Sequence, residues 1–380
     1  MVSNIELVVL DTSHLSRLAT DWASSDYVRK RSAEQFVPRL LDHGWLPLLS
    51  WHQIEELLQH GDESLVDTRL RYLWSWPMTA WVTSEKPNVF PGSVLNVFTA
   101  EVCAAYSHPE LDALGVRDVA STELLAYGTG IEAVPSSLSD WRLLRPMLAE
   151  QQAHAQKVAA ISPWRAADID RTRLADWLDK PLRSTETIDQ RLSDLRTRLE
   201  REIATRGDKR IQSATDVADD FMAEVTANGC PVAADDSTVP PAMRILLNAG
   251  LEPDDVNPSA TFRETMDLLM FRQRLKMASD SANLPWSKVK QVVTRDRLPS
   301  AIVTECMRTY GHDQPERKGS DVNDVSLLCL APYASHTFVD KRTLESVRRA
   351  KQKASHLGGI LGDVRKAAGY REIMALLPPR

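Results

Sequence analysis

Residues 5–10 read IELVVL, a run that is apolar at every position except Glu6 and that is followed directly by Asp11. A strand with one face in water alternates apolar and polar residues, whereas a strand buried on both faces reads as an unbroken run rich in Val and Ile. Strands of the second kind belong to parallel sheets that helices cover on both sides. Residues 5–10 therefore favour an α/β fold.

The following segments continue this pattern. A helical stretch at about residues 32–43 precedes WLPLLS at 45–50, which is a second expected strand. Ser50 and Gln53 have the spacing of a capping box, so a helix is expected to begin there. Residues 78–83, MTAWVT, form a third expected strand. Strand, helix and strand thus alternate through the first part of the chain.

The middle of the chain has a different character. Helical segments joined by Pro, Gly and Asn turns run from about residue 95 to 318. Residues 185–206 predict the clearest helix, with an apolar stripe that could pack within the chain or pair with a second chain. Another helix is expected at 259–277, and residues 228–258, rich in Pro, Asp, Ala and Asn, are expected to form a long loop.

The α/β pattern returns in residues 319–343, GSDVNDVSLLCLAPYASHTFVDKRT. An amphipathic run begins after Ser320, and a short strand at 335–339 ends at Asp340. A basic helix is expected at about 343–356. We therefore predict a three-layer α/β/α domain with a central parallel sheet. Residues 1–95 and 319–380 would supply its two halves, and residues 96–318 would be a mostly α-helical insertion.

Acidic residues stand at the ends of these elements. Asp11 and Asp340 each follow an apolar strand, and the carboxyl ends of parallel strands meet at one edge of a sheet. Asp321 and Asp324 are three residues apart, so they share one helical face. Glu55 and Glu56 are adjacent, so at most one of them can point inward, and Glu55 is expected to be a solvated helix residue.

A convergent group of carboxylates suggests a bound cation. Carboxylates held together without a metal repel one another and raise one another's pKa. Mg²⁺ and Mn²⁺ prefer such oxygen ligands, and they can activate a water for attack on a phosphodiester. Each residue also has a purely structural interpretation, since an acid such as Asp321 in the first turn stabilises a helix by about 0.3–1 kcal/mol.

The order of these acids along the chain resembles that of the PIN-domain nucleases. The matching stretches are LVVLDTS at 7–13, SWHQIEELLQHG at 50–61 and the block at 319–343. Val339 stands where that family often has Thr or another hydroxyl residue, and Ser335 stands where related sequences often have another Asp. By position, the four acids of the family correspond to Asp11, Glu56, Asp324 and Asp340, and Asp321 is an additional acid one turn before Asp324.

The resemblance implies a metal-dependent endonuclease that hydrolyses phosphodiester bonds of single-stranded RNA or DNA. Asp11, Asp324 and Asp340 would be ligands of Mg²⁺ or Mn²⁺, Glu56 a ligand or a water-orienting group, and Asp321 would act through a bridging water. A toxin, an antiviral defence effector and a processing nuclease all fit this chemistry. The alternative is a catalytically inactive PIN-like scaffold, or a nucleic-acid-binding or assembly protein that acts through its helical insertion.

Basic residues are concentrated near the end of the chain. The whole chain has a net charge of −6, yet residues 340–380 contain ten Lys or Arg and only four acids. Affinity for a phosphate backbone comes largely from Lys and Arg. Lys341, Arg342, Arg348 and Arg349 are therefore the expected substrate contacts, although a helix with this spacing of cations can also be a plain solvated face. Residues 29–31, RKR, form a second basic cluster.

Other classes of protein lack their signatures here. The four cysteines form no CxxC pair, and HExxH, GxxxxGK[ST] and GxGxxG motifs are absent. A dehalogenase-like phosphatase would need an Asp where Ser13 stands. The lack of a basic leader, of an 18-residue apolar run and of a disulfide framework favours a cytoplasmic protein without a membrane span. An inhibitory or effector protein partner and a homo-oligomer both remain open.

Overall fold

The computed structural model describes residues 5–85, 90–161, 171–178, 185–229, 241–312 and 314–378. The chain forms two compact units. The first comprises Met1–Ala153, Ser281–His312 and Ser320–Arg380, and the second comprises His154–Asp280 and Asp313–Gly319. The first unit thus extends well beyond residue 95 and takes in a segment that precedes residue 319.

The first unit is built on a six-stranded sheet with the strand order β4-β3-β2-β1-β5-β6. All neighbouring strands are parallel except β3 and β4, which are antiparallel. The sheet is therefore mostly parallel, as the apolar run at residues 5–10 predicts. The strands are β1 Glu6–Leu10, β2 Trp45–Leu49, β3 Thr79–Val82, β4 Leu125–Gly128, β5 His336–Val339 and β6 Asp363–Lys366.

Strand β1 is central, and its side chains are buried on both faces of the sheet. Val8 and Val9 point to opposite faces, and both are fully buried. On one side β1 pairs with β2, and on the other it pairs with β5, which comes more than 300 residues later. The order of the strands reverses at this point, so a crevice is expected outside the carboxyl ends of β1 and β5.

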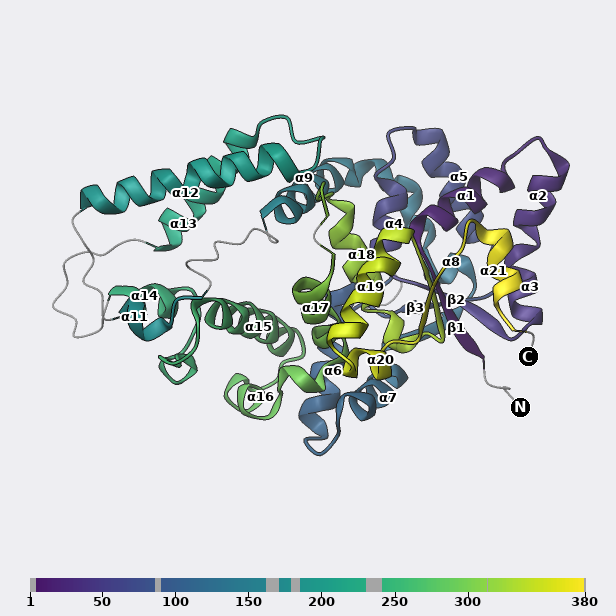
Figure 1. Cartoon of the computed structure of the whole chain (residues 1–380). Helices are drawn as coiled ribbons and strands as arrows, with labels where there is room; N and C mark the ends of the chain where they lie inside the picture. The colour runs from purple at the N-terminus through teal and green to yellow at the C-terminus, as the bar shows by residue number, and fades with distance from the viewer. Residues whose placement is uncertain are drawn as a thin grey trace. The chain divides into compact units, whose positions relative to one another are not determined.

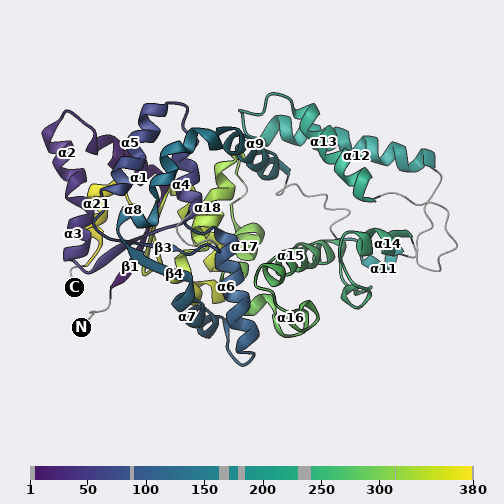
Figure 2. The same ribbon diagram turned by 180° about the vertical axis from the view of Figure 1, so that it is seen from behind.

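Helices cover both faces of the sheet (Figures 1 and 2). One layer contains α1 Thr12–Trp22, α2 Tyr27–Glu34, α3 Phe36–Asp42, α5 Glu63–Trp74 and α21 Tyr370–Leu376. The other contains α6 Val94–Ser107, α7 Ala113–Leu124, α17 Pro299–Tyr310, α18 Ser320–Leu328 and α19 Lys341–Lys353. Helix α4, Trp51–Leu58, contacts α1 from the first layer and α18 from the second. The shorter helices of this unit are α8 Gly130–Ala133, α16 Trp286–Val292 and α20 His356–Ile360.

A buried carboxylate explains why α17 belongs to the unit that contains the sheet. Glu101 of α6 has no solvent exposure. Its carboxylate accepts hydrogen bonds from the backbone N–H of Ser300 at 2.9 Å, from the Ser300 hydroxyl at 2.6 Å and from the Tyr333 hydroxyl at 2.9 Å. The charge of Glu101 therefore caps the start of α17, and it links α6 to the chain just before β5.

Two strands have no counterpart in the sequence-based expectation. β4 reads LAYG and β6 reads DVRK, and they form the two edges of the sheet. An edge strand is partly solvated, so it does not need the apolar run by which β1 and β2 can be recognised. β4 also places a strand inside the segment that was expected to be helical.

The second unit is helical in its described part. Its helices include α11 Leu174–Leu178, α12 Thr185–Arg206, α13 Ala214–Gly229, α14 Pro241–Asn248 and α15 Phe262–Ser281. From the predicted apolar stripe, Leu199 and Ile203 are buried against Val217 and Ala218 of α13, so this part of the stripe packs within the chain. The expectation of one long loop at 228–258 is wrong where α14 forms, and residues 230–240 lie outside the described residues. Across the described ranges, no helix combines the length and apolar character needed to cross a membrane.

Candidate active site

Asp11 and Asp340 occupy equivalent positions on the neighbouring strands β1 and β5. Each is the N-cap residue of the helix that follows its strand. The Asp11 carboxylate accepts a hydrogen bond from the Ser13 N–H, and the Asp340 carboxylate accepts one from the Thr343 N–H, both at 2.7 Å. The Asp11 N–H also donates to the carbonyl of Phe338 at 2.9 Å, which ties the two strand ends together. The two aspartates thus face the same edge of the sheet.

Asp324 reaches this edge from α18. Burial, together with the nearby charges of Asp11, Asp340 and Asp321, raises the pKa of its carboxyl to about 8. A hydrogen bond with the Thr343 side chain lowers the pKa but does not reverse the shift. The pKa of Asp324 therefore lies above neutral because its carboxyl is buried and because three other carboxylates lie near it.

Glu56 joins the same group from α4. Burial raises the pKa of Glu56, and the charge of Asp11 raises it further. A hydrogen bond with the Thr12 side chain and the charge of Arg69 lower it. The four acids that the sequence singles out, Asp11, Glu56, Asp324 and Asp340, are therefore brought together from four different elements.

The position of α4 follows from its first turn. Gln53 is only 1% exposed, and its side-chain oxygen accepts a hydrogen bond from the Ser50 N–H at 2.8 Å, which confirms the expected capping box. Its amide N–H donates to the carbonyl of Leu10 at 2.8 Å. The helix that carries Glu56 is thereby fixed to the last residue of β1.

Glu55 differs from its expected role. It is buried, with 9% exposure, rather than a solvated helix residue. Burial raises the pKa of its carboxyl, and the neighbouring charge of Glu56 raises it further. Its carboxylate accepts a hydrogen bond from the Gln59 amide at 3.2 Å and lies 3.8 Å from a ring nitrogen of His52. Glu55 can be buried beside the half-buried Glu56 because α4 contacts helices from both layers.

Asp321 and Arg342 form an ion pair with each other. An Arg342 nitrogen lies 3.1 Å from one carboxylate oxygen of Asp321 and 3.2 Å from the other. Asp321 also contributes to the raised pKa of Asp324, so it belongs to the edge of the acidic group. The pair joins α18 to the first turn of α19.

The remaining expected substrate contacts lie on the solvent side of α19. Lys341, Arg348 and Arg349 are exposed, together with Lys353. Their spacing of seven, eight and twelve residues from Lys341 places them along one stripe of the helix. Lys341 lies 3.7 Å from Glu345, and the two side chains are 74% and 51% exposed. The stripe begins beside Asp340 and is strongly basic.

The donor set suits a hard divalent cation, because its members are carboxylates. Within the residues that the structure describes, however, no three His, Cys, Asp or Glu side chains are grouped so that they could hold one ion. The carboxylates of Asp11 and Asp340 bond to their own helices, and that of Asp321 pairs with Arg342. The carboxylates are therefore of the chemical type that Mg²⁺ or Mn²⁺ binds. In this structure the carboxylates of Asp11, Asp340 and Asp321 interact with backbone N–H groups and with Arg342.

Sequence reasoning missed three residues at this site, namely Thr12, Arg69 and Thr343, and it expected Gln53 only as a capping residue. The two threonines lie in the first turns after Asp11 and Asp340, and each bonds to an acid from another helix. Arg69 is 7% exposed and donates to the Leu57 carbonyl at 2.9 Å and to the Ser16 hydroxyl at 2.6 Å. Its spacing from the apolar residues Val66, Leu70 and Leu73 places it on the buried face of α5, which is a signal that the sequence does contain.

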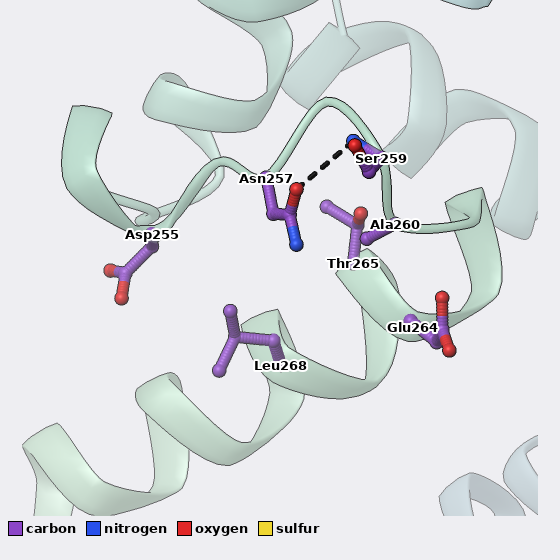
Figure 3. Close-up of a pocket in the computed structure, with 7 residues that line it drawn as sticks. All are labelled: Asp255, Asn257, Ser259, Ala260, Glu264, Thr265 and Leu268. Carbon is purple, nitrogen blue, oxygen red and sulfur yellow. Dashed lines mark hydrogen bonds between the residues drawn. The ribbon is translucent and has the colours of Figure 1, made fainter. Parts of the chain in front are cut away.

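A separate pocket of about 440 Å³ lies in the second unit (Figure 3). It contains none of the acids discussed above. Its polar groups bond within the chain, since Asn257 accepts from the Ser259 N–H at 3.0 Å, Glu264 accepts from the Thr261 N–H at 2.8 Å, and Asp255 lies 3.1 Å from Arg272. Its lining consists of Asp255, Asn257, Ser259, Ala260, Glu264, Thr265 and Leu268.

Comparison with known proteins gave no match. No protein-family model, no curated protein and no solved structure matches this chain. The function is therefore argued from the acidic group at the carboxyl ends of β1 and β5.

Proposed function

We propose that this protein is a metal-dependent endonuclease that hydrolyses phosphodiester bonds in single-stranded RNA or DNA. The observation that carries the proposal is the placement of Asp324 beside Asp11 and Asp340 at the carboxyl ends of β1 and β5, a crowding that, with burial, raises the pKa of Asp324 to about 8. Like charges are costly to hold together inside a protein, and strongly shifted pKa values cluster at functional sites.

Asp11, Asp324 and Asp340 are the residues that would hold Mg²⁺ or Mn²⁺. Such an ion, when bound, supplies an activated water and neutralises charge on the phosphate. Asp324 would bind as the carboxylate, so its proton must leave. Asp321 pairs with Arg342 at 3.1 Å. In the proposal it lies at the edge of the site and would act through a bridging water.

Glu56 would orient a water or complete the ligand set. Burial raises the pKa of its carboxyl above the ordinary value, which makes this carboxylate a better proton acceptor. The hydrogen bond with Thr12 and the nearby charge of Arg69 hold it in place and favour its ionised form. Thr343 has the corresponding effect on Asp324.

The basic stripe of α19 is the surface on which a phosphate backbone would lie. Lys341, Arg348 and Arg349 are exposed on the helix that begins directly after Asp340. Arg342 faces Asp321, so we assign it to the rim of the site, where a phosphate could replace Asp321 as its partner. Base-reading modules are not needed for such contacts, which depend on charge.

The PIN-like identity of the domain belongs to the same proposal. It is supported by the order of the acids along the chain and by the mostly parallel sheet whose central strand ends at Asp11. In this view the second unit is an insertion that positions the substrate, holds a partner or masks the site.

The test is cleavage of end-labelled single-stranded RNA and DNA with Mg²⁺ or Mn²⁺. Wild type is compared with Asp11→Asn and Asp324→Asn, and with Asp363→Asn as the control. Asp363 lies at the first residue of β6, in register with His336 at the first residue of β5, and is therefore at the opposite end of the sheet. We expect both site variants to lose cleavage and the control to keep it.

Undiminished cleavage by both site variants would contradict the assignment of the site. A wild type that neither cleaves nor binds a divalent ion would favour the scaffold alternative.

A further inference from the structure

Gln53 joins two elements that carry acids. It lies in the first turn of α4 and is almost completely buried. Its amide N–H donates to the Leu10 carbonyl at 2.8 Å and lies 3.5 Å from the carbonyl of Leu48 on β2. Its side-chain oxygen accepts from the N–H of Ser50 at 2.8 Å and from the hydroxyl of Ser50 at 3.2 Å. One side chain thus bonds to the ends of β1 and β2 and to the start of α4.

Two of the four site acids, Asp11 and Glu56, lie on the elements that these bonds connect. Asp11 is the residue after Leu10, and Glu56 is three residues after Gln53 on the same helix. Residues three apart on a helix lie on neighbouring positions of one face. A shift of the Gln53 amide against Leu10 therefore moves Glu56 against Asp11.

We propose that Gln53 is a positioning residue that sets the place of Glu56 relative to Asp11. This inference rests on the proposed nuclease function. Gln53 itself contacts neither substrate nor ion, and it acts through the hydrogen bond to Leu10. Buried hydrogen bonds of this kind orient the groups that contact substrate or ion. Loss of such a hydrogen bond typically costs about 10–100-fold in activity or metal affinity.

The chain provides a matched control for the capping function of Gln53. Asn96 on α6 accepts from the N–H of Ser93 at 2.9 Å and from the hydroxyl of Ser93 at 3.3 Å, which is the same box with nearly the same distances. Helix α6 carries none of the four acids. A substitution at Asn96 therefore measures the effect of losing a helix cap, without displacing a site acid.

The experiment measures kcat and KM for a labelled single strand with Mn²⁺, using Gln53→Met and Asn96→Ala in the full-length protein. We expect Gln53→Met to lower kcat about 10–100-fold with KM nearly unchanged, and Asn96→Ala to leave kcat at the wild-type value. Thermal unfolding of both variants checks that their stabilities are comparable. Should Gln53→Met fail to fold, Gln53→Asn takes its place, because its amide is one methylene too short to reach both Ser50 and Leu10.

A double variant separates positioning from general damage. In the background of Glu56→Gln, adding Gln53→Met should lower kcat by less than about twofold, because the group that Gln53 positions is already disabled. An equal loss in both backgrounds, or a wild-type kcat for Gln53→Met alone, would overturn the inference and leave the proposed function standing. Absence of cleavage by wild type would instead refute the proposed function, and the inference with it.

Discussion

Replacing Asp324 by asparagine removes the carboxyl that the fold places among three other carboxylates. The pKa of this group rises from an ordinary value of 3.8 to about 8 in the folded protein. The folded state therefore keeps a proton that the unfolded state releases between about pH 4 and pH 8. In that window the contribution of Asp324 to the free energy of unfolding of wild type falls by about 1.4 kcal/mol per pH unit.

The Asp324→Asn variant carries no such proton. Its free energy of unfolding should therefore exceed that of wild type by an amount that grows with pH. Between pH 4 and pH 7 the difference is expected to increase by about 4 kcal/mol, which is three units at about 1.4 kcal/mol each. Below pH 4 the difference should become constant, because both states of wild type are then protonated at this position.

Urea unfolding followed by tryptophan fluorescence is a suitable assay, since Trp45, Trp76 and Trp141 are buried in the core of the first unit. Asp363→Asn serves as the control, because Asp363 lies at the other end of the sheet and is 42% exposed. A site cation at a hundred times its dissociation constant should stabilise wild type by about 2.7 kcal/mol, and it should stabilise Asp324→Asn much less. If Asp324→Asn gains nothing over wild type between pH 4 and pH 7, Asp324 does not lie in the acidic group described here.

Two further predictions concern α19 and β5. Arg348→Glu combined with Arg349→Glu should weaken binding to a labelled single strand. It should also lower the magnitude of the slope of log K against log salt by about 1.4, since each phosphate contact contributes about 0.7. Arg29→Glu combined with Lys30→Glu on α2 is the control, and an equal effect of both pairs would argue against specific binding to the basic stripe of α19. Thr337→Val should raise the free energy of unfolding by about 1 kcal/mol, because the Thr337 hydroxyl is buried without a hydrogen-bond partner among the described residues. Urea unfolding measures this, and a less stable variant would show that the hydroxyl does have a hydrogen-bond partner.

The central strands of the fold could be predicted from the sequence for a physical reason. A strand buried on both faces is apolar at its buried positions, as β1 is from Leu7 to Leu10 and β2 is throughout. The edge strands β4 and β6 are partly solvated, so their sequences contain no comparable signal. The same difference explains why the sequence placed the end of the first half at residue 95, since β4, which lacks an apolar run, and the helices around Glu101 follow that position.

The positions of the candidate acids at the ends of their elements could be predicted from the sequence, but the contacts of these acids could not. Asp11 and Asp340 follow apolar strands, and the rule for carboxyl ends of parallel strands places them together. The partners of the acids depend on which helices meet above that edge. The hydrogen bond between Thr343 and Asp324 and the ion pair between Asp321 and Arg342 arise from such packing, and no local pattern in the sequence specifies them.

The account rests on one central claim, that the acids at the carboxyl ends of β1 and β5 form a divalent-ion site. Mn²⁺ binding to the full-length protein, followed by the relaxation of water protons, tests it most directly. The account predicts binding by wild type and by Asp363→Asn, and at least tenfold weaker binding by Asp11→Asn and by Asp340→Asn. Equal Mn²⁺ affinity in all four proteins, or no binding by wild type, would contradict it.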